Sequence, residues 1–338
     1  FLNSLSISQI LFAGFRGVNL IRASKDEVKA AGFDLAADKA NIKNSIITTY
    51  YNHYKLIESK KVVLENIKVM QQRLKDAQNL RSVGMALKND ELQIQLAISN
   101  LQQTADDIQS AIDISNYNLG IMLGLPDNTQ IEIGESGLFS AKPSFDEASG
   151  VKNALMVRPE IKAADIRFNE SKKRLAIARG MYAPIISAGF NAYYSKPNQR
   201  VFIEDQIRFH DSWDIGVKLS WNISNIFTTN FVTDEAKANI RGATAAQQIA
   251  GENIRMEVNA NYSAYKTAID KIELNQTAID QAIENQRLTK DQLANGVKNT
   301  TDMLNADNQV ITSQIGLLSA KIDAEIAYAK LMKATGNN

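Results

Sequence analysis

The positions of the prolines constrain the fold of this 338-residue chain more than any other feature. All five lie between Pro126 and Pro197, so a long stretch on either side contains none. A proline in a helix interior costs about 3 kcal/mol, and proline-free stretches of this length are what very long helices need. The distribution therefore predicts long helices on both sides of a shorter, interrupted middle region.

Apolar residues recur at seven-residue steps in both stretches. This period of 3.5 is typical of long packed helices and not of strands. Residues 20–80 are predicted to form one helix, roughly 90 Å long at 1.5 Å per residue. We interpret the columns as packing surfaces and not as ligand sites. The column in the first stretch consists of Val28, Leu35, Ile42, Thr49, Leu56, Val63, Met70 and Ala77.

The two stretches are copies of one unit. A nearly constant offset relates equivalent residues, which indicates an internal duplication. We predict a helical hairpin in each copy, over residues 18–124 and 228–336, which turns at the first glycine of its copy and ends at the second. The matched residues are Tyr51, Tyr54, Lys55, Gly84, Leu92 and Gly124 with Tyr262, Tyr265, Lys266, Gly296, Leu304 and Gly336.

Residues 213–223 alternate strictly between apolar and polar side chains, as a strand with one wet face does. Trp213 and Trp221 lie on the apolar face, roughly 26 Å apart, close to the roughly 25 Å apolar band of an outer-membrane barrel. Residues 2–12 and 184–195 alternate in the same way, and Phe190 and Tyr194 lie on the apolar side. We predict that these four aromatic residues face a membrane, although a soluble sheet with one face on a core has the same pattern.

Three strands in a membrane would leave unpaired backbone groups at both edges. We therefore predict that other copies of the chain complete the sheet. The polar segment 196–212 is predicted to be a loop outside the bilayer, and residues 151–183 a helix that leads into the strand at 184–195.

Composition excludes several classes of function. The chain has 38 Lys and Arg against 37 Asp and Glu, which gives no reason to expect a nucleic-acid partner. It has no Cys and two His, and no nucleophile-elbow, phosphate-loop or metal-ligand pattern. We expect no catalytic residues, no cofactor and no metal site.

Five local motifs occur in the order in which the TolC-like outer-membrane efflux channels have them, and the chain resembles that family over nearly its whole length. Residues 11–17 resemble the family's strand-to-helix junction, and residues 158–161 its helix-opening Arg-Pro-Glu motif. Residues 182–184 are similar to its helix-to-strand turn. Residues 82–86 resemble the signature of its hairpin tip, and residues 295–300 are a weaker second copy.

The resemblance implies a mainly α fold with a transmembrane β-barrel portion. Three copies would each give four strands to a shared twelve-stranded barrel in the outer membrane, and the duplicated hairpins would form an α-barrel that extends into the periplasm. Such channels are passive export ducts whose partners are a periplasmic adaptor and an inner-membrane transporter. Residues 125–150 would be the equatorial segment, with a short strand at 130–133. The family's first helices and first strand would lie upstream of Phe1, and its second equatorial segment beyond Asn338.

The resemblance also implies a gate and a docking surface at the hairpin tips. Asp90, Lys298 and Asp302 match charged positions that close the periplasmic end, but an ordinary solvated helix face explains them equally well. The tips are the surfaces expected to dock the adaptor, and simple solvated turns are the alternative. The docking residues are Arg81, Ser82, Val83 and Gly84 in the first tip and Asn295, Gly296 and Val297 in the second.

Two functions from different classes remain open at this point. The first is the outer-membrane export channel. The alternative is a soluble periplasmic coiled-coil adaptor or structural protein, whose strands would belong to a small water-soluble domain. The alternation in residues 213–223 separates the two, because only the channel would expose that apolar face to lipid.

Overall fold

The structure is a computed structural model that describes residues 1–127, 129–134, 146–196 and 209–337. The chain divides into two compact units, which we describe separately. Unit 1 contains residues 1–37 and 157–253, and unit 2 contains residues 38–156 and 254–338. Residues 197–208 of the predicted loop at 196–212 lie outside the described residues, and residues 210–212 belong to a strand instead of the loop.

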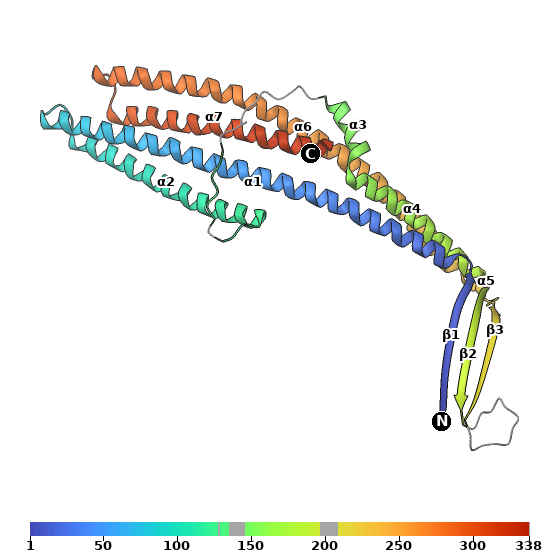
Figure 1. The fold of residues 1–338 in the computed structure, drawn as a ribbon. Coiled ribbons are helices and arrows are strands. Elements are labelled where there is room, and N and C mark those ends of the chain that lie inside the picture. The colour runs from blue at the N-terminus through green and yellow to red at the C-terminus, as the bar shows by residue number, and fades with distance from the viewer. Residues whose placement is uncertain (128, 135–145, 197–208, 338) are drawn as a thin grey trace. The chain divides into compact units, whose positions relative to one another are not determined.

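The helices form two pairs of matching lengths, one in each predicted copy (Figure 1). In the first copy, α1 (Arg16–Ser82) is followed by α2 (Lys88–Leu123); in the second, α6 (Asn230–Ala294) is followed by α7 (Thr300–Thr335). The long helices have 67 and 65 residues, and both return helices have 36. No helix in the described ranges is both long and apolar enough to cross a membrane.

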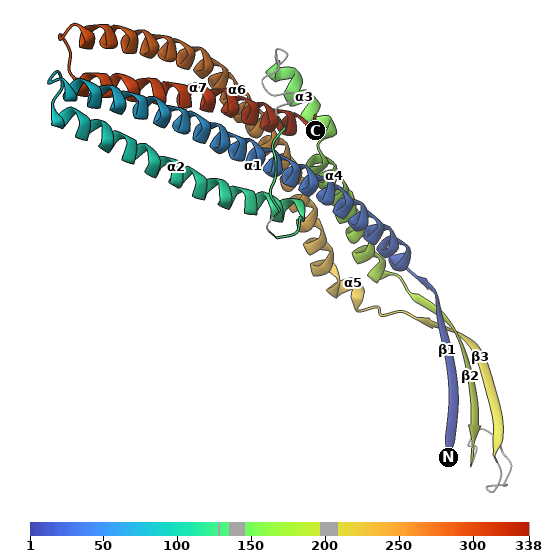
Figure 2. The ribbon, with the colours of Figure 1, turned by 60° about the vertical axis from the view of Figure 1, so that its left-hand side comes forward.

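Unit 2 holds the return helices and the parts of α1 and α6 that pack on them, side by side in Figures 1 and 2. Its core is a row of clusters in which α7 packs against the first hairpin. Val63 and Ile67 of α1 pack with Ala105 of α2, and Ile315 of α7 covers them. Nearer the tips, Met70, Ile94 and Ile98 form the next cluster, covered by Leu304 among others.

Unit 1 packs its helices through small residues, and this overturns part of the predicted column. Val28 and Leu35 are exposed, whereas the alanines at 23, 30 and 37 on another face of α1 are buried. Asp34 and Asp26 of α1 pair with Arg167 and Lys173 of α4 (Pro159–Arg179). Alanines allow two helix backbones to approach closely, so the larger side chains of α1 remain on its open side.

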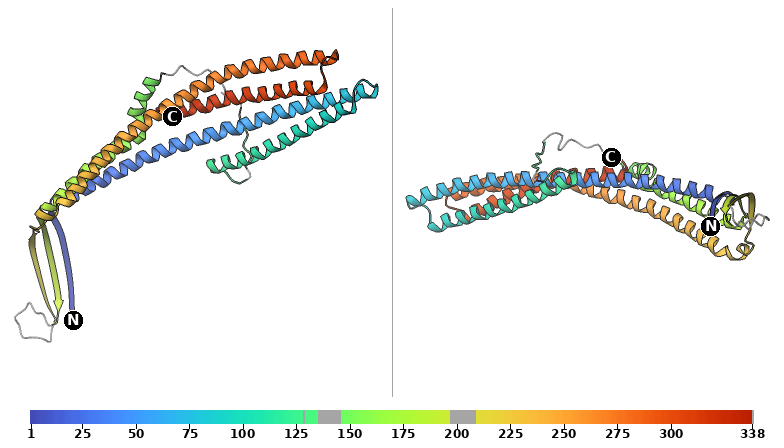
Figure 3. Two further views of the ribbon diagram at one scale, coloured as in Figure 1. Left: turned by 180° about the vertical axis from the view of Figure 1, so that it is seen from behind. Right: turned by 60° about the horizontal axis from the view of Figure 1, so that its bottom comes forward.

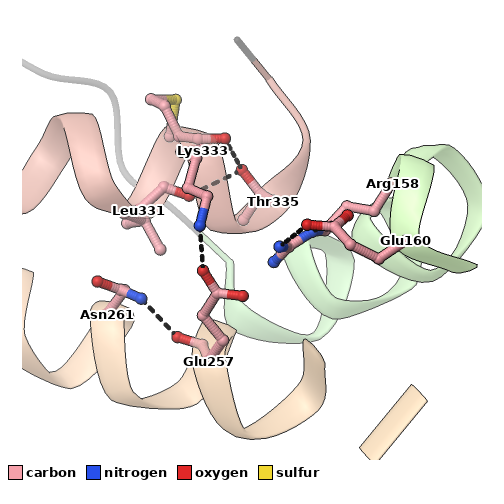
Figure 4. Close-up of polar contacts among 8 residues, drawn as sticks. Arg158, Glu160, Glu257, Asn261, Leu331, Lys333 and Thr335 are labelled. Atoms are coloured by element: carbon pink, nitrogen blue, oxygen red, sulfur yellow. Dashed lines mark hydrogen bonds and ion pairs between the residues drawn. The ribbon is translucent and has the colours of Figure 1, made fainter. Parts of the chain in front are cut away.

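The segment before the second strand is interrupted and is not one helix over 151–183. It consists of α3 (Glu147–Val157), α4 and the 3₁₀ turn η1 (Gly180–Tyr182). The break falls at Arg158, where Pro159 occupies the first position of α4, because the residue before a proline avoids the helical conformation. The helix start expected from the Arg-Pro-Glu motif is confirmed. Arg158 forms a two-bond pair with Glu160, at 2.6 and 3.1 Å (Figure 4).

The short strand expected at 130–133 is absent from the structure. These residues hydrogen-bond instead to a side chain: the Ile131 amide donates to Asn116 Oδ1 at 3.0 Å, and Asn116 Nδ2 donates to the Thr129 carbonyl at 2.9 Å. An isolated segment needs a partner strand to form a ladder, and Asn116 on α2 satisfies its backbone instead.

Three antiparallel strands in unit 1 form one sheet in the order β1-β2-β3. They are β1 (Leu2–Ala13), β2 (Ile185–Ser195) and β3 (His210–Ser220). Figure 3 shows the sheet from two further directions. The third strand begins and ends earlier than the predicted range of 213–223, and Trp221 follows its last residue. The early end is caused by Pro184, which precedes β2 and has no N–H with which to continue the ladder beyond Ile185 and Ser220.

Candidate functional site: the apolar sheet face and the hairpin tips

One face of the sheet is apolar and exposed. Paired residues lie on the same side of an antiparallel sheet, so the register assigns the faces directly. Trp213, Ile215 and Val217 on β3 are 67%, 73% and 72% exposed, which is unusual for a contiguous apolar set. The rows across the sheet are Leu5–Ala192–Trp213, Ile7–Phe190–Ile215, Gln9–Ala188–Val217 and Phe12–Ile186–Leu219.

A bulge in β1 keeps this face apolar to its end. The register shifts between Ile10 and Phe12, so Leu11 has no partner and Phe12 pairs with Ile186. One extra residue reverses the side to which later side chains point. Phe12 therefore replaces Leu11, which the simple alternation had placed on this face.

The opposite face of the sheet is polar. Ser4, Ser6 and Ser8 of β1 alternate with the apolar residues, and Asn191 Nδ2 of β2 donates to Asp214 Oδ1 of β3 at 2.7 Å. Lys218 lies on this side opposite Ser187. The sheet thus has one face suited to lipid and one suited to water.

The four aromatic residues predicted to face a membrane all lie on or next to this sheet, but their contacts differ. Phe190 lies 6.5 Å from Trp213, ring centre to ring centre, and Tyr194 stacks on Phe209 at 5.1 Å. Trp221 lies past the strand, where its Nε1 donates to the Tyr182 carbonyl at 3.0 Å. A tryptophan with an anchored N–H and an exposed ring is typical of a membrane–water boundary.

The two hairpin tips in unit 2 turn in the same way. Gly84 and Gly296 have φ of 76° and 74°, a left-handed conformation that favours glycine. At the first tip the Met85 amide donates to the Leu80 carbonyl at 2.8 Å, and at the second the Val297 amide donates to the Gln292 carbonyl at 2.9 Å. Both long helices thus end in the same glycine-centred C-cap, as the duplication predicts.

The return helices begin with related caps, and these engage two of the three predicted gate residues. Asp90 Oδ2 accepts from the Leu87 amide at 3.0 Å. Asp302 Oδ2 accepts from the Asn299 amide at 3.1 Å, and Asn299 Oδ1 accepts in return from the Asp302 amide at 2.9 Å. The second cap is a full capping box, whereas the Leu87 side chain has no acceptor and leaves the first cap half formed.

The structure brings together two of the three predicted gate residues. Lys298 Nζ lies 3.6 Å from Asp302 Oδ1, and both side chains are partly exposed. Asp90 belongs to the other tip, and no contact in the described residues joins it to either. The two tips are linked instead by the Thr301 hydroxyl, 3.0 Å from Gln93 Oε1.

Sequence analysis missed the most buried charge of the first tip. Glu91 is 6% exposed and pairs with Arg81 and with Lys88 Nζ, the latter at 2.9 Å. The hydrogen bond from Lys88 holds the pKa of Glu91 below its ordinary value, and the hydrogen bond from Gln78 and the charge of Arg81 act in the same direction. The second copy has Met303, 2% exposed, at the equivalent position. A charged residue in one copy where the other copy has a buried methionine is the sequence signal that could have identified Glu91.

The far end of the second hairpin is held by one ion pair between α6 and α7 and by hydrogen bonds within each helix (Figure 4). Lys333 Nζ lies 2.9 Å from Glu257 Oε1, and the Thr335 hydroxyl donates to the Leu331 carbonyl at 3.0 Å. Gly336 then ends α7 in the left-handed conformation, as Gly124 ends α2. Both predicted C-caps are confirmed.

A duplicated long hairpin in one unit and a sheet with an exposed apolar face in the other define a class, the mainly helical outer-membrane proteins. Comparison with solved structures shows the same fold. The chain matches the channel protein CusC with a TM-score of 0.86 at 17% identity, covering 100% of this chain and 78% of that one. It matches the outer-membrane protein VceC of Vibrio cholerae with a TM-score of 0.82 at 16% identity, covering 98% and 79%.

Sequence comparison identifies the family. The model of the outer membrane efflux protein family matches residues 150–337, more than half of the chain, and the chain belongs to this family. It is 24% identical to the outer membrane efflux protein BepC of Brucella suis, over 98% of this chain and 71% of BepC. The resemblance to the family and the location in the outer membrane are therefore confirmed.

Proposed function

We propose that this chain is the outer-membrane channel of a tripartite efflux or secretion system, a passive duct through which small molecules or proteins leave the cell. Three copies would share one twelve-stranded β-barrel and one α-barrel that extends into the periplasm. A periplasmic adaptor and an inner-membrane transporter would be the partners. The observation that carries the proposal is the exposed apolar face of a sheet with two open edges.

The open edges favour an assembly of several copies. Each backbone group left unpaired in hydrocarbon costs several kcal/mol, so an open three-stranded sheet cannot remain alone in a bilayer. Copies arranged around an axis pair every edge and enclose the polar face. The described residues supply three strands in each copy, so a twelve-stranded barrel needs one more from each.

The helices support the same assembly. Val28 and Leu35 of α1 and Ile249 of α6 are more than half exposed. Apolar columns on long helices are ordinarily covered by neighbouring helices. Helices of the adjacent copies would cover them in a closed α-barrel.

The tips would carry gating and docking. Asp90, Lys298 and Asp302 would close the periplasmic end, and the exposed residues of both tips would contact the adaptor. Val83 and Val297 are 68% and 71% exposed, which suits contact with another protein's helical hairpin. The polar sheet face would line the duct, so selection would depend on width and lumenal charge.

Neighbouring positions on β1 provide the test. Ile7→Lys places a charge on the apolar face, and Ser6→Lys places the same charge on the polar face, opposite Asn191. A cation facing lipid costs about 2–4 kcal/mol near the bilayer midplane. We expect Ile7→Lys to reduce heat-resistant trimers in outer-membrane extracts, and Ser6→Lys to leave them unchanged while altering single-channel conductance in planar bilayers.

The alternative, a soluble coiled-coil adaptor or structural protein, gives the opposite result. It would be monodisperse without detergent, and both lysine variants would behave like the unmodified chain. That outcome would reject the channel.

A further inference from the structure

A buried ion pair joins the two hairpins below their tips, in unit 2. Asp307 of α7 is 1% exposed, and its Oδ1 lies 2.8 Å from Arg73 Nη2 of α1. Gln286 of α6 donates to the same oxygen, also at 2.8 Å. Asp307 lies about two turns into α7, so one carboxylate holds three helices together close to the second tip.

The surroundings of this pair are apolar. Met303, Ala306 and Val310, on the adjacent turns of α7, are 2%, 2% and 6% exposed, and Met70 of α1 is 2% exposed. Burial raises the pKa of Asp307 above its ordinary value, against the charge of Arg73 and its hydrogen bonds from Arg73 and Gln286. In such surroundings, removal of one charge leaves the other without compensation.

The pair is not the two-bond fork that arginine and a carboxylate ordinarily form. Both contacts fall on Oδ1. Asp307 Oδ2 and Arg73 Nε are buried and make no hydrogen bond in the described part of the chain. Each partner therefore retains a buried polar atom without a hydrogen bond, and a small shift of α7 along α1 could bring these two atoms together.

The pair has no counterpart in the first copy. Gln95 is equivalent to Asp307, and its Nε2 donates to Glu91 on its own helix at 3.3 Å. The charge at position 307 is therefore specific to the contact between α1 and α7 and is not a general feature of the repeat.

We infer that Arg73 and Asp307 are positioning residues that hold α7 against α1 and thereby set the distance between the two hairpin tips. They would restrain hairpin movement more strongly than the exposed Lys298 and Asp302 do. The claim that this pair restrains opening of the periplasmic end rests on the proposed function. The claim that it sets the distance between the tips does not depend on that function.

The absence of native cysteine makes the test direct. Spin labels at Val83→Cys and Val297→Cys report the distance between the tips, with labelled chains diluted in unlabelled ones so that each assembly carries one labelled copy. We expect Asp307→Asn to lengthen and broaden this distance distribution. Asp323→Asn is the matched control, because Lys55 and Asp323 also join α1 to α7, at 3.1 Å, but Asp323 is exposed and Lys55 only half-buried.

A second variant separates positioning from general stability. Arg73→Met combined with Asp307→Leu replaces the pair by apolar groups, which often preserves or improves stability. We expect this double variant to restore a narrow tip distance. An unchanged distribution in Asp307→Asn, or equal broadening in Asp323→Asn, would overturn the inference. If Asp307→Asn does not fold, Arg73→Gln takes its place with the same two criteria.

Conductance tests the consequence for a channel. In reconstituted trimers, Asp307→Asn is expected to raise the open fraction several-fold, and Asp323→Asn is expected to leave it unchanged. If unmodified trimers do not conduct, the proposed function fails while the distance measurement still decides the inference. If they conduct and Asp307→Asn conducts equally, the positioning role fails.

Discussion

Gly14 and Gly180 meet backbone to backbone where β1 passes into α1. Gly14 has φ of 61°, and a Cβ at either glycine would collide with the other's carbonyl oxygen. Phe15 also adopts a left-handed conformation, with φ of 57°, which costs a non-glycine residue about 1–2 kcal/mol. Its ring contacts that of Phe12 edge to face at 5.3 Å, an interaction that offsets part of this cost.

Gly14→Ala is therefore expected to destabilise the folded protein by at least about 2 kcal/mol, through the unfavourable φ and the steric overlap together. Gly17→Ala is the control, because Gly17 lies in α1 with no atom within 4 Å of an added Cβ. It should be neutral or stabilise by up to about 1 kcal/mol. The midpoint of chemical denaturation measures both, and equal midpoints would contradict the account of this junction.

Glu91 should give the first tip a pH-dependent stability. Its pKa is lowered in the folded protein, so its stabilisation is present above the ordinary glutamate pKa of about 4.3 and is lost as pH falls through the lowered folded value. We expect Glu91→Gln to unfold at lower denaturant concentration than the unmodified chain at pH 7. The difference should vanish in stronger acid, while the exposed Glu27→Gln should show little difference at either pH.

At the scale of helices and strands, the duplication makes each copy a control for the other. The two return helices have the same length and the same type of start, but only the second has a side-chain acceptor at its N-cap. Such an acceptor contributes about 1 kcal/mol. The first copy therefore lacks a stabilising contact that the second has.

Leu87→Asn should stabilise the first hairpin by about 1 kcal/mol, and Asn299→Ala should destabilise the second by about the same amount. Both are measured as shifts of the unfolding midpoint. Leu87→Ala is the control, because it also removes the exposed leucine but adds no acceptor. It shows how much of the change in stability comes from the lost leucine and how much from the new cap. A stabilisation by Leu87→Ala equal to that by Leu87→Asn would argue against the cap.

At the scale of the whole molecule, unit 1 carries an exposed apolar sheet face and unit 2 carries two exposed hairpin tips. The contact between Lys298 and Asp302 is long and partly exposed, and such pairs contribute about 0–1 kcal/mol. Any gate built on this pair alone would be weak, and the buried Arg73–Asp307 pair is the stronger restraint on the hairpins.

Lys298→Ala in reconstituted trimers should accordingly raise single-channel conductance or open fraction modestly, by no more than about fivefold. Lys237→Ala is the control, because Lys237 also forms a partly exposed ion pair, with Asp234 at 2.8 Å, but lies on the part of α6 in unit 1, away from the tips. Unchanged conductance in Lys298→Ala would remove this residue from the gate.

Much of this architecture was predictable from short-range patterns. Proline-free heptad stretches specify long helices, matched glycines specify where the helices end, and alternation specifies which side of each strand is apolar. The helix and strand patterns depend on residues within about two helical turns of one another, and the match between the copies is read directly from the sequence, so the sequence alone determines these features.

The tertiary structure decided which stripe of each helix meets which partner. In the folded protein, α1 packs through its alanines and not through Val28 and Leu35. A bulge in β1 leaves Leu11 without a partner, and Arg73 of the first hairpin pairs with Asp307 of the second. The spacing of apolar residues shows which face of a helix is apolar, but it does not show which element packs on that face. Partner choice depends on side-chain volume and charge at positions far apart in the chain, which only the folded protein brings together.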